Sequence, residues 1–166
     1  MQNILIINTG GTFNKVYNRV TGKLEIDKSG KAIKEIAKAW LTELKIVNII
    51  GKDSLDMTQD DREEILNIVK SAVEDRIIIV HGTDTIDKTA QYLSRANLDK
   101  RIVLTGAMTP FSINPIEATA NLSSAYGYLL QLKENNVYIS MNSKIDLYHR
   151  VIKNRGKGYF MITPKS

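Results

Sequence analysis

Uninterrupted runs of branched aliphatic residues alternate along the chain with segments in which apolar residues recur every three or four positions. Such runs are typical of strands covered on both faces of a sheet, and they fall at residues 3–8, 45–50, 76–81, 101–105 and 137–141. The spacing of three or four positions predicts helices, at residues 30–39, 58–72, 85–97 and 114–132. The alternation predicts a three-layer α/β fold with a doubly wound, mostly parallel sheet and right-handed crossovers.

Three segments lack a regular pattern. Residues 13–27 are polar and contain turn-forming residues, so we expect a flexible loop or hairpin there. Residues 106–113 predict a loop, and the basic, glycine-containing residues 143–158 predict a loop or lid.

Two of the predicted helices carry recognisable start signals. Thr58 and the acidic residues after it resemble a capping box, in which the acids also suit the positive end of the helix dipole. Asn114 suits the N-cap of the last helix, Pro115 its first turn, and Glu117 the capping-box position.

Composition limits the possible chemistry. The 166 residues suit one domain, which we predict to span residues 1–166. The chain has no Cys, and its two His, His81 and His149, are far apart in sequence, so we expect neither a disulfide framework nor a metal site. A mononucleotide or phosphate site is also disfavoured, because both G-x-G-x-x-G and G-x-x-x-x-G-K-[ST] are missing.

The chain shows no sign of membrane or nucleic-acid partners. No apolar run approaches the roughly 20 residues that span a bilayer, and the N-terminus resembles no signal peptide, so we expect a cytoplasmic protein. The formal net charge is +5, with Lys and Arg scattered among acids, which favours a solvated surface. A nucleic-acid surface remains an alternative without a supporting motif, and its cations would be Lys144, Arg150, Lys153, Arg155 and Lys157.

Two threonine-containing loops follow predicted strands. Residues 9–12 read Thr-Gly-Gly-Thr, and residues 81–85 read His-Gly-Thr-Asp-Thr. In open α/β sheets, ligands bind beyond the carboxyl ends of the strands. We therefore predict a two-sided site to which each loop contributes a hydroxyl group.

The residue types in these loops suit nucleophilic catalysis. A threonine such as Thr12 becomes a nucleophile when a base or polar network takes its proton, and the adjacent Gly11 can bring a backbone amide close to an oxyanion. Asp84 can face a ligand ammonium or orient a lysine. Each motif also has a purely structural interpretation: Thr12 and Asp84 as helix caps, and His81 as a hydrogen-bonded structural residue, which for His81 is the favoured one.

These loops resemble the two signatures of the bacterial-type L-asparaginase/glutaminase family, the threonine-nucleophile amidohydrolases. The Gly-Ala-Met-Thr-Pro segment at 106–110 and the Met-Asn pair at 141–142 resemble two further family segments. The resemblance extends from Ile4 to about Phe160. It implies the fold of the N-terminal domain of asparaginases, which is flavodoxin- or Rossmann-like.

The resemblance also implies roles for individual residues. Thr12 matches the nucleophile that forms an acyl-enzyme, and Thr83, Asp84 and Lys153 match a second triad that adjusts its proton balance. Tyr17 matches a tyrosine on a mobile loop that closes over the site.

Substrate contacts follow from the same resemblance. Ser54 and Asp56 match the segment that binds the α-carboxylate and α-amino groups of the substrate, although Leu55 stands where many members have a polar residue. Asp84 is expected to pair with the substrate ammonium. The remaining predicted substrate-binding residues are Gly11, whose amide would stabilise the oxyanion, Gly82 and Ala107.

The implied activity is hydrolysis of L-asparagine to L-aspartate and ammonia without a metal or cofactor. The chain resembles a short, single-domain form, and we expect a homo-oligomer, a dimer or tetramer, in which a partner subunit can complete the site. Two alternatives remain open: an amidohydrolase acting on another amide such as glutamine, and a non-catalytic module that binds asparagine or aspartate as a sensor or oligomerisation partner.

Overall fold

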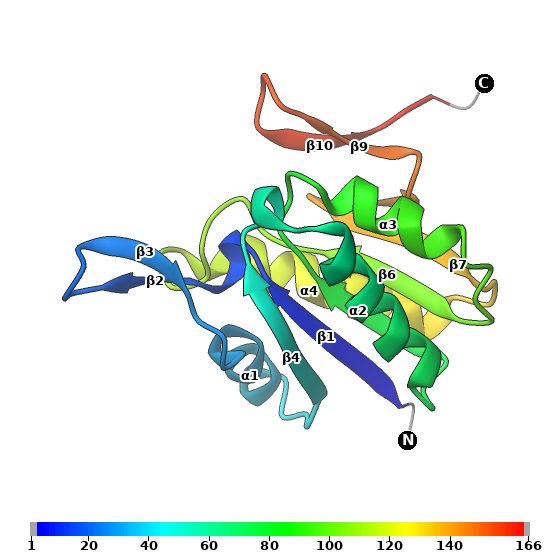
Figure 1. Ribbon diagram of the computed structural model, residues 1–166, viewed down its shortest axis with the longest axis horizontal. Coiled ribbons are helices and arrows are strands. Elements are labelled where there is room, and N and C mark those ends of the chain that lie inside the picture. The colour runs from blue at the N-terminus through cyan, green and yellow to red at the C-terminus, as the bar shows by residue number, and fades with distance from the viewer. Residues whose placement is uncertain (1–2, 165–166) are drawn as a thin grey trace.

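A six-stranded sheet between two layers of helices forms the body of the molecule, in a computed structural model that describes residues 3–164 (Figure 1). The strands are β1 (Ile4–Gly10), β2 (Lys15–Asn18), β3 (Lys23–Ile26), β4 (Lys45–Lys52), β5 (Arg76–Val80), β6 (Arg101–Thr105), β7 (Asn136–Met141), β8 (Lys144–Leu147), β9 (Val151–Asn154) and β10 (Tyr159–Ile162). The helices are α1 (Lys31–Ala39), α2 (Gln59–Ser71), α3 (Ile86–Ser94) and α4 (Pro115–Gln131), with 3-10 turns η1 (Thr12–Asn14) and η2 (Ser54–Asp56). The predicted three-layer, mostly parallel α/β fold is confirmed.

The order of the strands indicates where a ligand would bind. The sheet order is β4-β1-β5-β6-β7-β8, in which β8 alone runs antiparallel to its neighbour. The five parallel strands, taken in chain order, give the flavodoxin-like arrangement 2-1-3-4-5. The chain leaves β1 toward β4 on one side and later adds β5 on the other. The switch point, where ligands bind in such folds, therefore lies beyond the carboxyl ends of β1 and β5.

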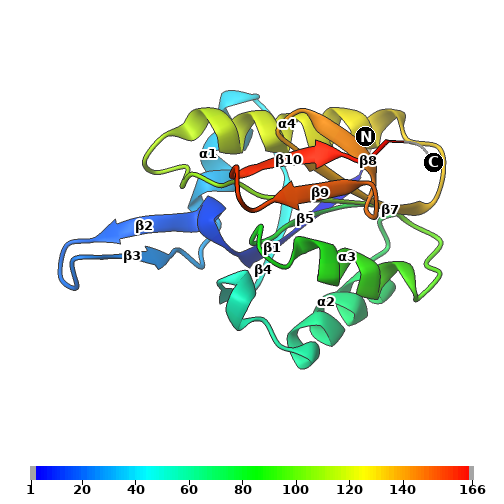
Figure 2. The same cartoon turned by 90° about the horizontal axis from the view of Figure 1, so that it is seen from above.

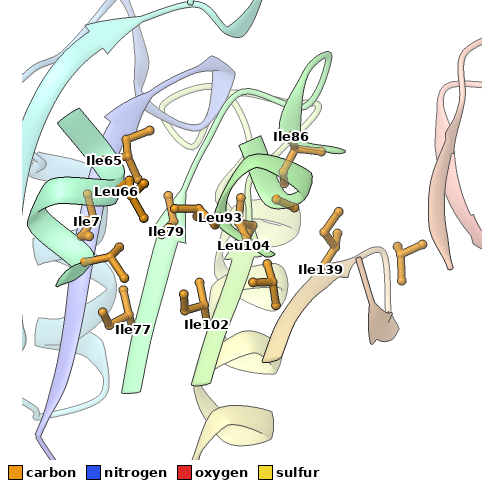
Figure 3. Packing of buried hydrophobic residues seen from close by; sticks show 14 of the residues in the cluster. Ile7, Ile65, Leu66, Ile77, Ile79, Ile86, Leu93, Ile102, Leu104 and Ile139 are labelled. Atoms are coloured by element: carbon orange, nitrogen blue, oxygen red, sulfur yellow. The ribbon is translucent and has the colours of Figure 1, made fainter. Parts of the chain in front are cut away.

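Two apolar clusters hold the layers together. One packs α2 and α3 against a sheet face, through residues that include Ile65, Leu93 and the strand residue Ile79 (Figure 3). The other packs α1 and α4 against the opposite face, through residues such as Ile33 and Leu122. Because the central strands are buried on both faces, their uninterrupted aliphatic sequence follows from the packing.

Two antiparallel hairpins lie outside the sheet. Residues 13–27 form η1 and the β2–β3 hairpin, one of the two predicted alternatives, and this hairpin projects away from the body (Figures 1 and 2). The prediction of a loop or lid at 143–158 is wrong in detail, because β8 joins the main sheet and β9 pairs with β10. In Figure 1 the β9–β10 hairpin lies above α3.

The predicted helix starts are right at one position and wrong at another. Thr58 and Asp61 form a complete capping box, since the side chain of each accepts a hydrogen bond from the backbone N–H of the other. Asn114 caps α4, but Glu117 does not complete a capping box. Its carboxylate instead accepts hydrogen bonds from the N–H groups of Met108 and Thr109, at 3.0 and 2.9 Å, and so fixes the loop after β6.

Within residues 3–164, no helix is both long enough and apolar enough to cross a membrane.

Candidate active site

The loops at 9–12 and 81–85 meet at the predicted position, and their backbones are in direct contact. A Cβ atom built on Gly11 would lie 2.5 Å from the Cα atom of Gly82, and Gly11 itself has a φ of +73°. A Cβ on Gly82 would in turn lie 2.6 Å from the Cβ of Ser54. Glycine at position 11 therefore allows the two threonine loops to approach each other, and glycine at position 82 allows the second loop to approach Ser54.

Thr12 begins the η1 turn and is partly accessible to solvent. Within residues 3–164, its side chain has no hydrogen-bond partner. The neighbouring N–H of Gly11 is not free, because it donates to the carbonyl oxygen of Lys52 at 2.9 Å. The prediction that the Gly11 amide stabilises an oxyanion is therefore wrong for this structure: that amide is used to join the loop to β4.

The second loop is fixed by Ser54. The Ser54 side chain is buried, and its Oγ accepts hydrogen bonds from the N–H groups of Asp84 and Thr85, at 3.2 and 3.3 Å. The Thr85 hydroxyl donates to the Ser54 carbonyl oxygen at 2.8 Å. Ser54 thus supports the loop, and contact between its remaining hydroxyl hydrogen and a substrate carboxylate stays a prediction.

His81, the first residue of this loop, is fixed by hydrogen bonds from both of its ring nitrogens. Its Nδ1 lies 2.7 Å from the Gly82 carbonyl oxygen, which requires a hydrogen on Nδ1, and its Nε2 lies 2.7 Å from the Thr89 hydroxyl. Arg62 donates to the hydroxyls of Thr89 and Thr85, each at 3.1 Å. Complete burial lowers the pKa of His81 to about 4, so the imidazole is neutral near pH 7. His81 is thus a hydrogen-bonded structural residue, as the favoured interpretation predicted.

Lys153 brings a charge to this loop from far along the chain. Its Nζ donates to Thr83 Oγ1 at 2.9 Å and to Asp84 Oδ1 at 2.8 Å. The lysine side chain is 12% exposed and reaches the loop from β9, whose partner strand is β10. The three residues predicted as a triad are therefore in hydrogen-bond contact. The Thr83 hydroxyl also donates to the Sδ atom of Met108 at 3.3 Å.

Arg155 is a residue of this cluster that the sequence did not assign to the site. Its Nη1 lies 2.9 Å from Asp84 Oδ1, the oxygen that Lys153 also contacts, and its Nη2 donates to the Asp84 carbonyl oxygen at 2.6 Å. The sequence placed Arg155 only in a cluster of basic residues. The two positions are separated by 71 residues, and no local pattern relates them.

The η2 turn exposes one apolar and one acidic side chain next to the second loop. Leu55 is 70% exposed, and Asp56 is also exposed and makes no ion pair within the described part of the chain. The preceding Asp53 pairs with Lys15 at 2.8 Å, and this hydrogen bond holds the pKa of the Asp53 carboxyl below its usual value. The predicted contact of Asp56 with a substrate stays a prediction.

Two predicted site residues lie differently from expectation. Tyr17 is 64% exposed on the projecting β2–β3 hairpin, and its hydroxyl makes no hydrogen bond to Thr12 or to any other residue between positions 3 and 164. Ala107 is 1% exposed and packs in the core cluster beside α4, so its side chain cannot contact a substrate. Its predicted binding role can be carried only by its backbone.

In the described residues, no group of three or more His, Cys, Asp or Glu side chains is arranged to hold a metal ion.

Comparison with known proteins agrees with this fold. Residues 3–163 match the family model described as "Asparaginase, N-terminal". The chain is 28% identical over 155 residues to a glutaminase-asparaginase of Acinetobacter glutaminasificans, covering 86% of this chain and 47% of that protein. It is 29% identical over 163 residues to a probable periplasmic L-asparaginase of Haemophilus influenzae, covering 87% and 44%.

A solved structure agrees in fold. The probable cytoplasmic L-asparaginase from Campylobacter jejuni superposes with a TM-score of 0.80 at 27% identity, over 96% of this chain and 52% of that one. This chain thus spans about half the length of the proteins that it matches. The extent of the family match and the agreement in fold show that the chain belongs to the asparaginase family, to whose N-terminal domain it corresponds.

Proposed function

We propose that the protein hydrolyses the side-chain amide of L-asparagine to L-aspartate and ammonia through an acyl-enzyme on Thr12. The observation that carries the proposal is the contact of Lys153 Nζ with both Thr83 Oγ1 and Asp84 Oδ1, at 2.9 and 2.8 Å. This contact fixes the Thr83 hydroxyl on a loop that touches the loop of Thr12, which suits the relay of a proton from a nucleophile.

In the first half of the reaction, Thr12 Oγ1 attacks the amide carbon. The Thr83 hydroxyl relays the proton: its oxygen accepts the proton of Thr12 as its own proton passes to the departing nitrogen, which leaves as ammonia, while Lys153 Nζ orients that oxygen. The C–N bond breaks as an ester forms between Thr12 and the aspartyl group. A water molecule then hydrolyses this ester and restores the Thr12 hydroxyl.

The amide of Thr12 itself is the best donor for the oxyanion in this mechanism. It is the first N–H of the η1 turn, and such groups have no acceptor within their own helix. The Gly11 amide, by contrast, is occupied by Lys52. A preorganised donor of this kind contributes roughly 3 kcal/mol to transition-state stabilisation.

The wider setting is part of the proposal. We propose that residues 1–166 form one domain, of which residues 1–2 and 165–166 lie outside the described part, and that copies of the chain associate as a dimer or tetramer. We also propose a cytoplasmic location. Of the similar proteins above, one is named as periplasmic and one as cytoplasmic.

Ammonia release from L-asparagine and from L-glutamine tests the activity. We expect release from L-asparagine by the unmodified chain, partial release by Thr12→Ser, and a loss of at least a thousandfold in kcat for Thr12→Ala and for Lys153→Met. Lys70→Met, on the exposed face of α2, is the matched control and should retain full activity. Undiminished release by Thr12→Ala or Lys153→Met would disprove the role of that residue.

A non-catalytic module that binds L-asparagine or L-aspartate is the second candidate function. It predicts binding of L-aspartate or L-asparagine, measured by calorimetry, without ammonia release at any protein concentration. Release that increases more than proportionally with protein concentration would instead indicate an enzyme whose site is completed by a second copy.

A further inference from the structure

A groove of about 550 Å³ lies between α2 and α3, which pack side by side on one face of the sheet (Figures 1 and 2). None of the residues assigned to the active site lines this groove. Three of its lining side chains are cations and none is acidic. The lining residues are Gln59, Arg62 and Leu66 on α2, and Lys88, Gln91, Tyr92, Arg95 and Ala96 on or directly after α3.

Arg62 is a buried cation without a carboxylate partner. It is 8% exposed, and among residues 3–164 it makes no ion pair. Its Nε and Nη2 donate to the hydroxyls of Thr89 and Thr85, each at 3.1 Å. Its Nη1 donates to the carbonyl oxygens of Met57 and Thr58, each at 3.2 Å. All four acceptors are neutral, and a buried charge that is not neutralised is costly, so a bound anion would stabilise this guanidinium.

One N–H group of Arg62 is available to such an anion. A guanidinium has five N–H groups, and the hydrogen bonds above leave one of them, on Nη2, without an acceptor in the described part of the chain. Because the Arg62 side chain forms part of the wall of the groove, a ligand in the groove can accept from this N–H.

Lys88 and Arg95 add two exposed cations to the same groove. They are two helical turns apart, with Gln91 between them on the same side of α3, and Arg95 still has helical backbone angles. Between positions 3 and 164, neither makes an ion pair. Together with Arg62 they place three positive charges around one groove.

The acidic side chains nearby do not neutralise these cations. Asp61 and Asp84 already have cationic partners. Asp87 is exposed and lies two positions from Thr89, which contacts α2, so it points to a different side of α3. A separate surface groove on α2 is lined by Asp60, Glu63 and Glu64. The excess of positive charge between α2 and α3 is therefore left to a ligand.

We propose that this groove binds a phosphate group, either as inorganic phosphate or as part of a phosphomonoester, through Arg62, Lys88 and Arg95. Guanidinium groups suit phosphate because their N–H groups match the positions of its oxygens. The side-chain amides of Gln59 and Gln91 can donate further hydrogen bonds. The proposal does not depend on amide hydrolysis, because it involves none of the residues that carry that reaction.

A solely structural role for Arg62 predicts a different result. Arg62 joins α2 to the 81–85 loop through Thr85, and this contact alone could explain why the residue is present. Lys88 and Arg95 would then be ordinary surface cations, and phosphate would not require them. A phosphate site instead makes binding depend on both.

Calorimetric titration of the full chain with inorganic phosphate and with phenyl phosphate tests this dependence. We expect one site with a Kd below roughly 1 mM, and about fivefold weaker binding in Lys88→Gln and in Arg95→Gln. Lys34→Gln is the matched control, since it removes an exposed cation from α1 on the opposite face of the sheet and should bind as the unmodified chain does. Whichever of the two ligands binds more tightly indicates the source of the phosphate group. Undiminished binding in both Lys88→Gln and Arg95→Gln would overturn the proposal, as would a lack of binding of either ligand.

Backbone amide chemical shifts locate the bound phosphate. The pair of Lys153 and Arg155 at Asp84 is a second cluster of cations near the 81–85 loop, and it is the competing location. The proposal predicts that the largest shift changes fall within residues 59–66 and 88–96. The largest changes around Lys153 and Arg155 would overturn it. Neither measurement involves turnover, so phosphate binding in the groove of a chain that releases no ammonia would contradict only the proposed amide hydrolysis.

Discussion

The two threonine loops meet at one edge of the sheet but treat their hydroxyl groups in opposite ways. The first loop is fixed by the buried Thr9 and Asn14, which donate to the carbonyl oxygens of Val80 and Gly10. Among residues 3–164, the hydroxyl of Thr12 has no hydrogen-bond partner. The second loop engages its hydroxyl fully, because Thr83 Oγ1 accepts from Lys153 and donates to Met108.

The two loops also differ in the charged side chains that contact them. The second loop is contacted by three cations, Arg62, Lys153 and Arg155, whereas none of them contacts the first. A nucleophile has to be free to reach a substrate, while a group that transfers protons has to be held in a network. Similar sequence motifs can therefore serve these two different purposes.

Replacing the two glycines at the close backbone contacts should have the largest effect on stability and activity. Gly11→Ala and Gly82→Ala each place a Cβ within 2.6 Å of neighbouring atoms, and at Gly11 the φ of +73° adds backbone strain. We expect each to lower the free energy of unfolding by roughly 3 kcal/mol or more and to abolish activity. Urea unfolding and ammonia release measure the two effects.

A matched glycine provides the control. Gly127 lies in α4, and a Cβ there would meet no atom within 4 Å. Gly127→Ala should therefore stabilise the protein, by about 0.5–1 kcal/mol, because glycine is unfavourable within a helix. Equal tolerance of alanine at positions 11, 82 and 127 would show that neither the contact between the two loops nor the contact of the second loop with Ser54 is needed.

The buried His81 of the second loop should make the free energy of unfolding depend on pH, with an effect of intermediate size. His81 has a pKa of about 4 in the folded protein, because burial disfavours the imidazolium, against about 6.5 when unfolded. Between these values the unfolded chain binds more protons, so stability is complete above about pH 6.5 and decreases as the pH falls toward 4. We expect a loss of about 2 kcal/mol between about pH 7 and pH 5.

Urea midpoints for two histidine variants assign this loss. His81→Gln should be less stable at neutral pH but should lose the dependence between about pH 7 and pH 5, whereas His149→Gln should retain it. The carboxyl groups of Asp53, Asp61 and Glu74 do not confuse this range, since their lowered pKa values place their contributions at more acidic pH. A dependence that persists in His81→Gln would contradict the account of the second loop.

The smallest effect on stability is expected on the side of the first loop. Tyr17 is 64% exposed, so Tyr17→Phe should change the free energy of unfolding by less than about 0.5 kcal/mol. The base of its hairpin borders a cavity of about 420 Å³ lined by residues that include Phe13, Val16 and Phe111. If the hairpin closes over Thr12 during turnover, Tyr17→Phe should lower kcat severalfold without loss of stability. An unchanged kcat in Tyr17→Phe would show that the Tyr17 hydroxyl has no role in the mechanism.

Much of the fold could be predicted from the sequence because burial on two faces leaves an uninterrupted aliphatic pattern, as in β5 and β6. The strands after β7 could not, because β8, β9 and β10 have four residues each and are defined by their partners. The prediction that Glu117 completes a capping box was wrong for a related reason. Its spacing fits a capping box, but its carboxylate accepts hydrogen bonds from two N–H groups of the loop after β6 instead.

Some residues of the site could likewise be predicted from the sequence, and others could not. Thr12, Thr83 and Asp84 could be singled out because each lies in a motif directly after a strand, and Lys153 because the chain resembles a known family. Arg155 could not be assigned, since its contact with Asp84 depends on the β9–β10 hairpin. The engagement of the Gly11 amide by Lys52 likewise depends on how β1 and β4 pair at their ends.

The most direct test of the account is to locate the covalent intermediate. The protein is mixed with L-asparagine, quenched in acid within the first turnover, digested and examined by mass spectrometry. The account predicts an aspartyl ester on the peptide that contains Thr12, and no such ester in Thr12→Ala. An ester on the peptide that contains Thr83 would exchange the roles of the two loops and contradict the account.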